Sequence, residues 1–257
     1  MILIRLLISV FLCTGIGGCT SNTAPAATSF GAGPRRILIV GNSLSGANNL
    51  GAMVVAIADS AKVASPPTVD VYWQPNYALI DHWNDGRVQK MIANGHYDVV
   101  VLQQGPSSVS ANRDTLRLAT KLFAPVIRAS GAMPALFAVW PTVDRQQDFD
   151  GATTSYQLAA EDVHATDIPG GEVWRAAWRR DASLPLYSPD GLHPSALGSY
   201  GVALSMVGML YDRSVIGLPA TIRLPTGETM NFDPATVRVL QAAADEANHS
   251  YGIQGTR

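Results

Sequence analysis

Cysteine is scarce in this sequence, and its position excludes two kinds of stabilising site. The 257 residues include only Cys13 and Cys19, both within the first 20 positions. The rest of the chain can therefore hold neither a disulfide framework nor a cysteine-based zinc site. A folded domain beyond residue 20 must instead be stabilised by the packing of apolar side chains.

Charge is also sparse. Only 15% of the residues are charged, and 18 Lys and Arg stand against 20 Asp and Glu, for a formal net charge of −2. Such a chain offers no basic field to a phosphate backbone, so nucleic acid is not an expected partner. With 47% hydrophobic residues, the composition is that of a globular protein with an ample core. The length favours one domain and allows two.

The first 19 residues have the layout of a targeting segment. Residues 1–12 are apolar apart from Arg5 and Ser9 and are too few to span a bilayer as a permanent helix. The run Ile16-Gly17-Gly18-Cys19 resembles a bacterial lipobox, which implies that Cys19 is acylated and anchors the protein in the cell envelope, outside the cytoplasm. The alternative is an ordinary signal peptide and a soluble periplasmic or secreted protein. Residues 20–34 are rich in Ala, Ser, Thr, Gly and Pro, which predicts a flexible tether.

From residue 35 onward, short β-branched runs alternate with longer amphipathic stretches. The runs are short and apolar, as buried parallel strands are. We expect strands at 36–40, 69–73, 99–102, 135–140 and 165–168, and helices at 49–62, 79–94, 113–130, 154–163 and 195–211. This alternation predicts an α/β domain in which helices cover both faces of a parallel sheet. Trp174 and Trp178, at helical spacing, are expected to pack another helix onto that sheet.

The pattern changes from residue 214. Residues 220–224 and 228–232 flank a Pro-Thr-Gly turn and are expected to form a hairpin. Asp233 then offers an N-cap and Pro234 a first helical position for a last helix through about residue 248. We interpret 214–257 as an appendage of a single domain that spans 35–257.

Two loops at one expected sheet edge carry reactive side chains. Ser43 lies in the run GNSLS, directly after the first strand, where a tight turn exposes a hydroxyl near the positive end of the next helix. Such junctions are also rich in Gly, Asn and Ser for capping reasons alone. Asp190 and His193 lie in SPDGLHPS, at a spacing that lets a carboxylate orient an imidazole. Their joint placement favours a serine nucleophile with a histidine base.

Together, GNSLS and SPDGLHPS resemble the SGNH (GDSL-type) hydrolase family over about residues 35–211, with Asn42 where many members have Asp. The resemblance implies a three-layer α/β/α, flavodoxin-like fold with a mainly parallel five-stranded sheet. It also implies a catalytic triad, in which Ser43 is the nucleophile, His193 the general base and then acid, and Asp190 the residue that orients His193.

The sequence departs from the family where an oxyanion hole is expected. Members carry a Gly after the second strand, whereas this chain has Gln74-Pro75-Asn76-Tyr77; Asn76 is the best replacement, because Asn tolerates left-handed backbone. Members carry Gly-x-Asn-Asp after the third strand, whereas this chain has Gln103-Gln104-Gly105, and a Gln amide offers the same donors on a longer arm. The expected donors are the N–H groups of Ser43 and Asn76 and the side chain of Gln103 or Gln104.

The resemblance implies a serine esterase that uses no metal or other cofactor, and the sequence has no H-x-H or H-E-x-x-H zinc motif. The Gln-Gly pair resembles branches of the superfamily that act on acetylated carbohydrates, so an O-acetyl group on a glycan is the preferred substrate. The alternatives are a lipase or lysophospholipase, a glycan O-acyltransferase and, from another class, a non-catalytic glycan-binding lipoprotein.

Other residues are weaker candidates. His82 could line the pocket, but a partly exposed helical histidine is the expected state. Trp140 and Arg145 follow the fourth strand and could contact substrate, although a Trp that closes a strand is more often part of the core. Gly86 is expected inside a helix.

Overall fold

The structure is a computed structural model that describes residues 33–253. The predicted targeting segment, with Cys19, and all but the last two residues of the predicted tether lie outside the described residues.

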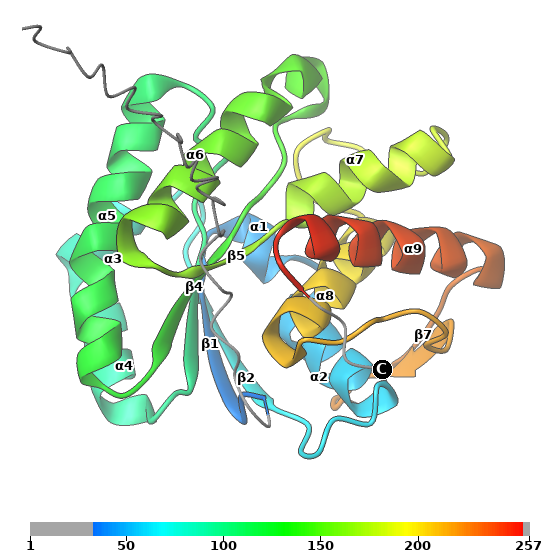
Figure 1. The fold of residues 1–257 in the computed structure, drawn as a ribbon, viewed down its shortest axis with the longest axis horizontal. Coiled ribbons are helices and arrows are strands. Elements are labelled where there is room, and N and C mark those ends of the chain that lie inside the picture. Colours follow the sequence, from blue (N-terminus) through cyan, green and yellow to red (C-terminus); the bar gives the residue numbers. More distant parts are fainter. Residues whose placement is uncertain (1–32, 254–257) are drawn as a thin grey trace, which may run out of the picture.

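Five parallel strands form the centre of the molecule (Figure 1). They lie in the order β2-β1-β3-β4-β5. Their bounds are β1 Arg36–Gly41, β2 Thr68–Trp73, β3 Val99–Leu102, β4 Met133–Phe137 and β5 Thr166–Ile168. The order changes direction at β1, which has β2 on one side and β3 on the other. Open α/β sheets bind ligands at such a switch point, beyond the carboxyl ends of the strands.

All five expected strands are present, but the fourth ends three residues early. After Phe137 the partner strand β5 stops at Ile168, so pairing continues only through the bond from Ala138 N to Ile168 O (2.9 Å). The chain then turns, and the ring of Trp140 stacks on Trp174 with 3.7 Å between ring centroids.

Helices cover both faces of the sheet, as the alternation predicted (Figure 1). On one face lie α3 Leu79–Asp85, α4 Arg87–Gly95, α5 Ser110–Ala129 and α6 Phe149–Val163. On the other lie α2 Leu50–Ser60, α7 Gly170–Arg180 and α8 Ala196–Tyr211, with α9 Pro234–Ser250 packed on α7 and α8. The expected continuous helix at 79–94 is wrong: Gly86, in a left-handed conformation at φ +74°, ends α3 and starts α4.

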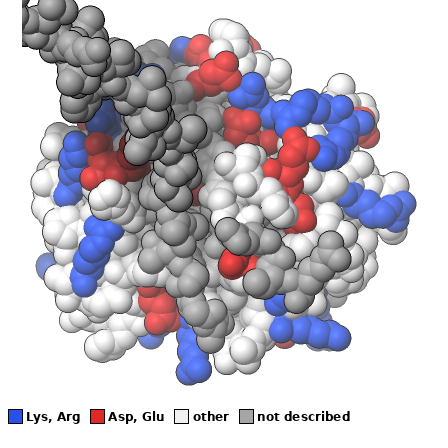
Figure 2. Space-filling model, in the orientation of Figure 1, with Lys and Arg blue, Asp and Glu red and all other residues white. Residues whose placement is uncertain are grey.

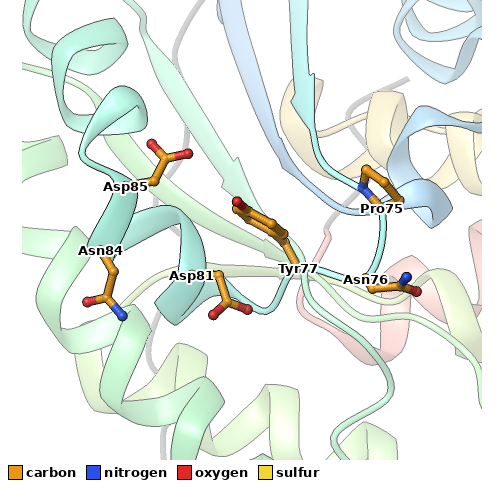
Figure 3. Close-up of a pocket in the computed structure, with 6 residues that line it drawn as sticks. All are labelled: Pro75, Asn76, Tyr77, Asp81, Asn84 and Asp85. Carbon is orange, nitrogen blue, oxygen red and sulfur yellow. The ribbon is translucent and has the colours of Figure 1, made fainter.

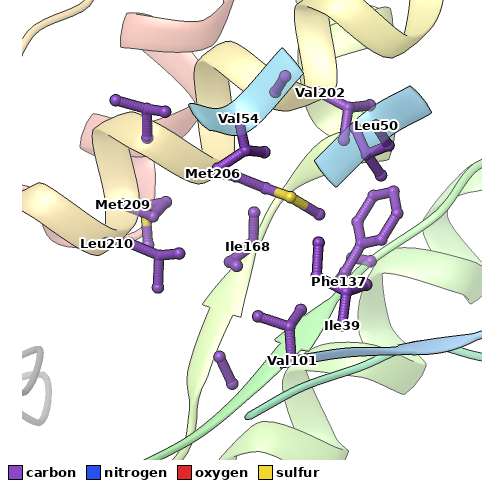
Figure 4. Packing of buried hydrophobic residues seen from close by; sticks show 14 of the residues in the cluster. Ile39, Leu50, Val54, Val101, Phe137, Ile168, Val202, Met206, Met209 and Leu210 are labelled. Carbon is purple, nitrogen blue, oxygen red and sulfur yellow. The ribbon is translucent and has the colours of Figure 1, made fainter. Parts of the chain in front are cut away.

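The core between the sheet and the second helical face is built from branched and sulfur-containing side chains (Figure 4). Figure 4 shows Ile39, Val101, Phe137 and Ile168 of the strands facing Leu50 and Val54 of α2 and Val202, Met206, Met209 and Leu210 of α8. The helix α8 is buried along nearly its whole length, because the sheet, α2, α7 and α9 surround it.

The C-terminal segment completes this layer. The predicted hairpin is formed by β6 Thr221–Arg223 and β7 Thr229–Asn231. Asp233 caps α9 by accepting from the backbone N–H of Thr236 at 2.8 Å, and Pro234 is the first helical residue, both as predicted. Because α9 covers α8, the tail contributes to the same core as the sheet.

Charged side chains of both signs are interspersed on the face shown in Figure 2. Arg175 pairs with Asp150 and Glu172, and Arg179 and Arg180 pair with Glu246 of α9. Within residues 33–253, no helix is both long and apolar enough to cross a membrane.

Candidate active site

Ser43 lies where β1 gives way to a single helical turn, α1 Ser43–Gly46. Asn42 caps this turn, since its side-chain Oδ1 accepts from the backbone N–H of Leu44 at 3.1 Å. Ser43 is the first residue of α1, a position whose N–H has no acceptor inside the helix. The hydroxyl and the N–H of Ser43 are therefore both presented at the carboxyl edge of the sheet.

The buried side chain of Gln103 fixes the conformation of this turn. Its Oε1 accepts from Asn42 N (3.0 Å) and from the Ser45 hydroxyl (2.7 Å), while its Nε2 donates to Asn42 Oδ1 (3.1 Å) and to Gln104 O (2.6 Å). Gly41 leaves room for it, because a Cβ at that position would lie 2.2 Å from Gln103 Oε1. Gln103 thus connects the end of β3 to the residues on both sides of Ser43.

His82 also supports this turn, through a hydrogen bond to Gly41. Its Nε2 is 2.8 Å from Gly41 O, an acceptor, so Nε2 carries the proton and donates. The ring is fully buried between Tyr72 and Tyr77, and burial lowers the pKa of His82. The expectation of a partly exposed histidine is therefore wrong: α3 turns this face inward, and His82 stays neutral.

Asp190 and His193 lie on the loop between α7 and α8, as predicted. Asp190 Oδ1 accepts from the backbone N–H groups of Leu192 and His193, both at 2.9 Å, and its Oδ2 lies 2.6 Å from His193 Nδ1. Ser195 follows as the N-cap of α8, accepting from Gly198 N at 3.0 Å. The carboxylate therefore orders its own loop and the imidazole together.

The two loops meet at Ser43. His193 Nε2 lies 2.8 Å from Ser43 Oγ, across 150 positions of sequence. With Nδ1–H donating to Asp190, Nε2 is the free acceptor for the Ser43 hydroxyl proton. The side chains of His193 and Asp190 remain 33% and 51% exposed, so this arrangement opens directly to solvent.

Hydrogen bonding keeps Asp190 ionised. The backbone N–H of Leu192, then the His193 side chain and the His193 backbone N–H, lower the pKa of Asp190 to about 2. A carboxylate that holds its charge at neutral pH can both fix the tautomer of His193 and stabilise an imidazolium at that position.

Asn76 adopts the left-handed backbone that its residue type allows, with φ +63°. Tyr77 N donates to Gln74 O (3.3 Å), and Pro75 precedes Asn76, which is the sequence and geometry of a type II turn. Asn42 Nδ2 donates to Tyr77 O at 3.2 Å and so joins this turn to the Ser43 turn. The structure brings the Asn76 turn to the side of the Ser43 turn, where sequence reasoning expected it.

The structure does not support an oxyanion donor from Gln103 or Gln104. Both N–H groups of Gln103 are taken by Asn42 Oδ1 and Gln104 O. Gln104 Nε2 donates to Ser107 Oγ (2.9 Å) and to Asn112 O (3.2 Å), and its Oε1 accepts from Leu79 N (3.1 Å). Backbone partners fix the direction of both amides. The physical reason is burial, since both side chains lie inside the fold and must be satisfied by protein groups.

Two pockets adjoin the Asn76 turn. The smaller, of about 230 Å³, lies between Asn42, the Asn76 turn and the Gln104 loop. The larger, of about 580 Å³, shares Asn76 and Tyr77 with it and continues past Asp81, Asn84 and Asp85 (Figure 3). Polar side chains thus follow the surface outward from the nucleophile turn.

The remaining candidate residues interact with parts of the structure other than Ser43. Trp140 is fully buried, and its Nε1 donates to Leu192 O at 3.0 Å, so it supports the His193 loop from inside. Arg145 is half-exposed and pairs with Asp148. Trp174 packs in the core, as expected of a helix facing the sheet. Residues 33–253 contain no group of three or more His, Cys, Asp or Glu side chains placed to hold a metal ion.

The chain was compared with protein-family models, with curated proteins and with solved structures. No family model and no curated protein matches it. A DUF4886 family protein from Bacteroides uniformis is 18% identical with a TM-score of 0.63, covering 86% of this chain and 96% of that one. A protein from Slackia heliotrinireducens assigned to the SGNH hydrolases is 24% identical with a TM-score of 0.58, over 68% and 97% of the two chains.

A variant of Axe2, an acetyl xylan esterase from Geobacillus stearothermophilus, is 13% identical with a TM-score of 0.55, over 68% of this chain and 94% of that one. The described chain has the parallel five-stranded sheet and the two helical layers that the family resemblance implied. The protein therefore has the SGNH hydrolase fold.

Proposed function

We propose that the protein is a serine esterase of the SGNH family that removes O-acetyl groups from glycans. The observation that carries the esterase proposal is the chain of contacts from Ser43 Oγ to His193 Nε2 (2.8 Å) and from His193 Nδ1 to Asp190 Oδ2 (2.6 Å). A nucleophile, a base and a residue that orients the base are in hydrogen-bond reach of one another, which is the arrangement that serine acyl transfer needs.

The proposed reaction has two steps. Ser43 Oγ attacks the ester carbonyl carbon as its proton passes to His193 Nε2, and the carbonyl oxygen becomes an oxyanion. When the tetrahedral intermediate collapses, the alcohol leaves with the proton from His193. Water then attacks the acyl-enzyme with His193 as base, which releases the carboxylic acid and restores the Ser43 hydroxyl.

The oxyanion hole in this proposal is formed by main-chain donors. Ser43 N–H lies at the start of α1, where it has no acceptor inside the helical turn. Asn76 N–H is the second donor, since the bond from Asn42 to Tyr77 O holds the Asn76 turn beside Ser43. Gln103 and Gln104 fix these elements in place and have no direct contact with the oxyanion.

We infer that the acyl group extends from Ser43 into the small pocket, which Asn42 and Asn76 line, and that the size of this pocket favours a short acyl group. At about 230 Å³ it is below the 300–1,000 Å³ typical of pockets for drug-sized ligands, and polar Asn, Gln and Ser side chains are among its lining. A long apolar chain would gain little there. This favours an acetyl ester over the lipid substrates of a lipase or lysophospholipase.

The surroundings of the site also fit a carbohydrate alcohol. Asp81, Asn84 and Asp85 along the larger pocket offer carboxylate and amide groups that can pair with hydroxyls (Figure 3). The acetyl xylan esterase with the same fold acts on such a substrate by its name, which supports the proposal by analogy.

Replacing Ser43 with Ala tests the esterase proposal. The variant should lose hydrolysis of p-nitrophenyl acetate by on the order of 10⁴-fold or more in kcat, with unchanged folding by circular dichroism. A fluorophosphonate probe should label the wild type at Ser43 and leave the variant unlabelled. An unlabelled wild type with no hydrolysis would instead favour a non-catalytic glycan-binding protein.

We also propose, from the lipobox resemblance, that Cys19 carries a lipid anchor that holds the enzyme at the cell envelope. Several acyl chains on one residue bury enough methylenes for stable membrane attachment. Replacing Cys19 with Ser should move the protein from the membrane fraction to the soluble fraction of a bacterial host and abolish labelling by radioactive palmitate. Palmitate labelling that survives the substitution would contradict the anchor site.

A further inference from the structure

Asn48 joins the two loops that meet at Ser43. Its side-chain Nδ2 donates to Pro194 O at 2.8 Å and to Ser199 Oγ at 3.0 Å. Asn48 follows Ser43 by five positions, and Pro194 directly follows His193. One amide therefore connects the nucleophile's own segment to the loop that carries the base.

Few other bonds make this connection. Within residues 33–253, the hydrogen bonds between segments 42–50 and 186–199 are the Ser43–His193 contact and the two made by Asn48. The other attachments of the His193 loop lead elsewhere: Trp140 Nε1 donates to Leu192 O, and Val143 N donates to Gly191 O. Those bonds fix the loop to the segment after β4. The distance between the loop and Ser43 is therefore set by the bonds of Asn48.

The two side-chain contacts of Asn48 explain why its backbone is held in a strained conformation. Asn48 and its neighbour Asn49 are both left-handed, with φ +53° and +55°, between α1 and α2. Non-glycine residues take this conformation at a cost in free energy, and Asn tolerates it better than most. Asn49 is exposed and its side chain makes no capping bond, whereas the Asn48 side chain is held by two acceptors.

The direction of the Asn48 amide is fixed by chemistry. Pro194 O can only accept, so the NH₂ group of Asn48 must face it, and both of its N–H donors are used. An aspartate of the same shape would place a carboxylate oxygen against a carbonyl oxygen. The two asparagines therefore form a natural pair, equal in backbone conformation and different in what the side chain binds.

We propose that Asn48 is a positioning residue that sets the distance between Ser43 Oγ and His193 Nε2 by holding the His193 loop against the Ser43 turn. This inference rests on the proposed esterase function. The loop is open to solvent on its other side, as the 33% exposure of the His193 side chain shows, so protein contacts on that side hold it less firmly. A displacement of about 1 Å between reacting groups can lower a rate by on the order of 100-fold.

The test compares Asn48→Asp with Asn49→Asp in the full-length protein. Asn48→Asp should lower kcat for p-nitrophenyl acetate by about 10- to 100-fold, leave KM within about twofold, and slow fluorophosphonate labelling of Ser43 in parallel. Asn49→Asp should stay within about twofold of the wild type in all three. Ser199→Ala, which removes one of the two acceptors, should cause a smaller loss of a few-fold.

Asn48→Gly is the second variant, with Asn49→Gly as its control. Glycine relieves the left-handed backbone and adds no charge near His193, so the fold should be retained while the loss of kcat persists. A folded Asn48→Asp or Asn48→Gly protein with wild-type kcat and labelling rate would overturn the inference. A wild type that is neither active nor labelled would overturn the proposed function itself, which keeps the two failures distinct.

Discussion

The two sides of the candidate active site are built in opposite ways. The nucleophile side, residues 41–46 with Gln103 and His82, is mostly buried, and the hydrogen bonds that Gln103 and His82 make to residues 41–45 reach across 41 to 61 positions of sequence. The base side, residues 188–195, is mostly part-exposed, with Pro189 and Asp190 exposed and Pro194 buried, and most of its bonds join residues two to six positions apart.

Because of this difference, substitutions that lower the stability of the fold and substitutions that lower catalytic activity should fall on different sides of the site. A buried polar network must be satisfied for the fold to form, so changes on the nucleophile side should act first on the free energy of unfolding. A part-exposed loop held mostly by local bonds can lose a catalytic group while the rest of the molecule stays folded. Substitutions on the two sides should therefore lower activity through different measurable quantities.

The largest effect is expected from Asp190→Asn on the base side. The new amide can keep Oδ1 as an acceptor for the loop, but its NH₂ would face His193 Nδ1 and stabilise the tautomer with the proton on Nε2. His193 could then not take the Ser43 proton, and kcat should fall by on the order of 10³–10⁴-fold.

The same variant should keep its melting temperature within about 2 °C of the wild type, because the residue is half-exposed. Steady-state kinetics and thermal denaturation together provide the measurement. A large loss of stability in Asp190→Asn would break the distinction between the two sides.

Gln103→Leu should show the reverse order of effects on the nucleophile side. Leucine nearly fills the space of the fully buried glutamine, but it leaves the Asn42 N–H without an acceptor and removes partners from the Ser45 hydroxyl and Asn42 Oδ1. Such losses should destabilise the fold by about 2–4 kcal/mol, a fall in Tm of about 5–15 °C.

Gln157→Leu on the exposed face of α6, where one bond to Tyr251 is lost, is the matched control and should change stability by less than about 0.5 kcal/mol. Scanning calorimetry of both variants measures the two melting temperatures. Equal melting temperatures for the two would show that the Gln103 network contributes little.

Acid should reduce the stability that His82 contributes to the nucleophile side at a pH where Asp190 is still ionised. Burial lowers the pKa of His82 in the folded state, so the unfolded chain binds the proton first as pH falls below about 6.5. The stability that neutral His82 provides is therefore present above that pH and is lost below it, at no more than about 1.4 kcal/mol per pH unit. Asp190, with a pKa of about 2, keeps its charge throughout that range.

His82→Gln removes the titrating group while keeping an N–H donor for Gly41 O. Urea unfolding at pH 7.5, 6 and 5 should show a smaller decrease in unfolding free energy for this variant than for the wild type. If the unfolding free energies of the two proteins fell equally with pH, the pKa of His82 would not differ between the folded and unfolded states.

The contrast between local and distant contacts also explains what sequence reasoning could find. The Asp190–His193 pair is visible because its two residues are three positions apart in one loop, and the left-handed Asn76 is visible because Pro75 and Asn76 form a turn signal. The strands are visible from their short apolar runs, and the cap of α9 from Asp233 and Pro234. Each of these signals lies within a few residues of the feature it predicts.

The features that sequence reasoning missed depend on distant partners. A glutamine after β3 offers donors in isolation, but only the packed structure shows that Asn42 and Gln104 O have already taken those of Gln103. His82 could be placed on a helix, but its burial depends on Tyr72 and Tyr77. Asn48 gave no signal at all, since its acceptors lie 146 and 151 positions away. Gly86 is the exception, because a glycine flanked by helical residues is a local stop signal that could have been read.

The exposure of His193 and Asp190 has a consequence for long substrates. A site that opens onto the surface of the protein does not require a polymer to enter by its end. If the substrate is an acetylated polysaccharide, the polysaccharide can lie across the mouth of the site. Its interior units can then lose acetate as readily as its terminal units. Acetate release from long chains should then begin along their whole length, with no dependence on the number of chain ends.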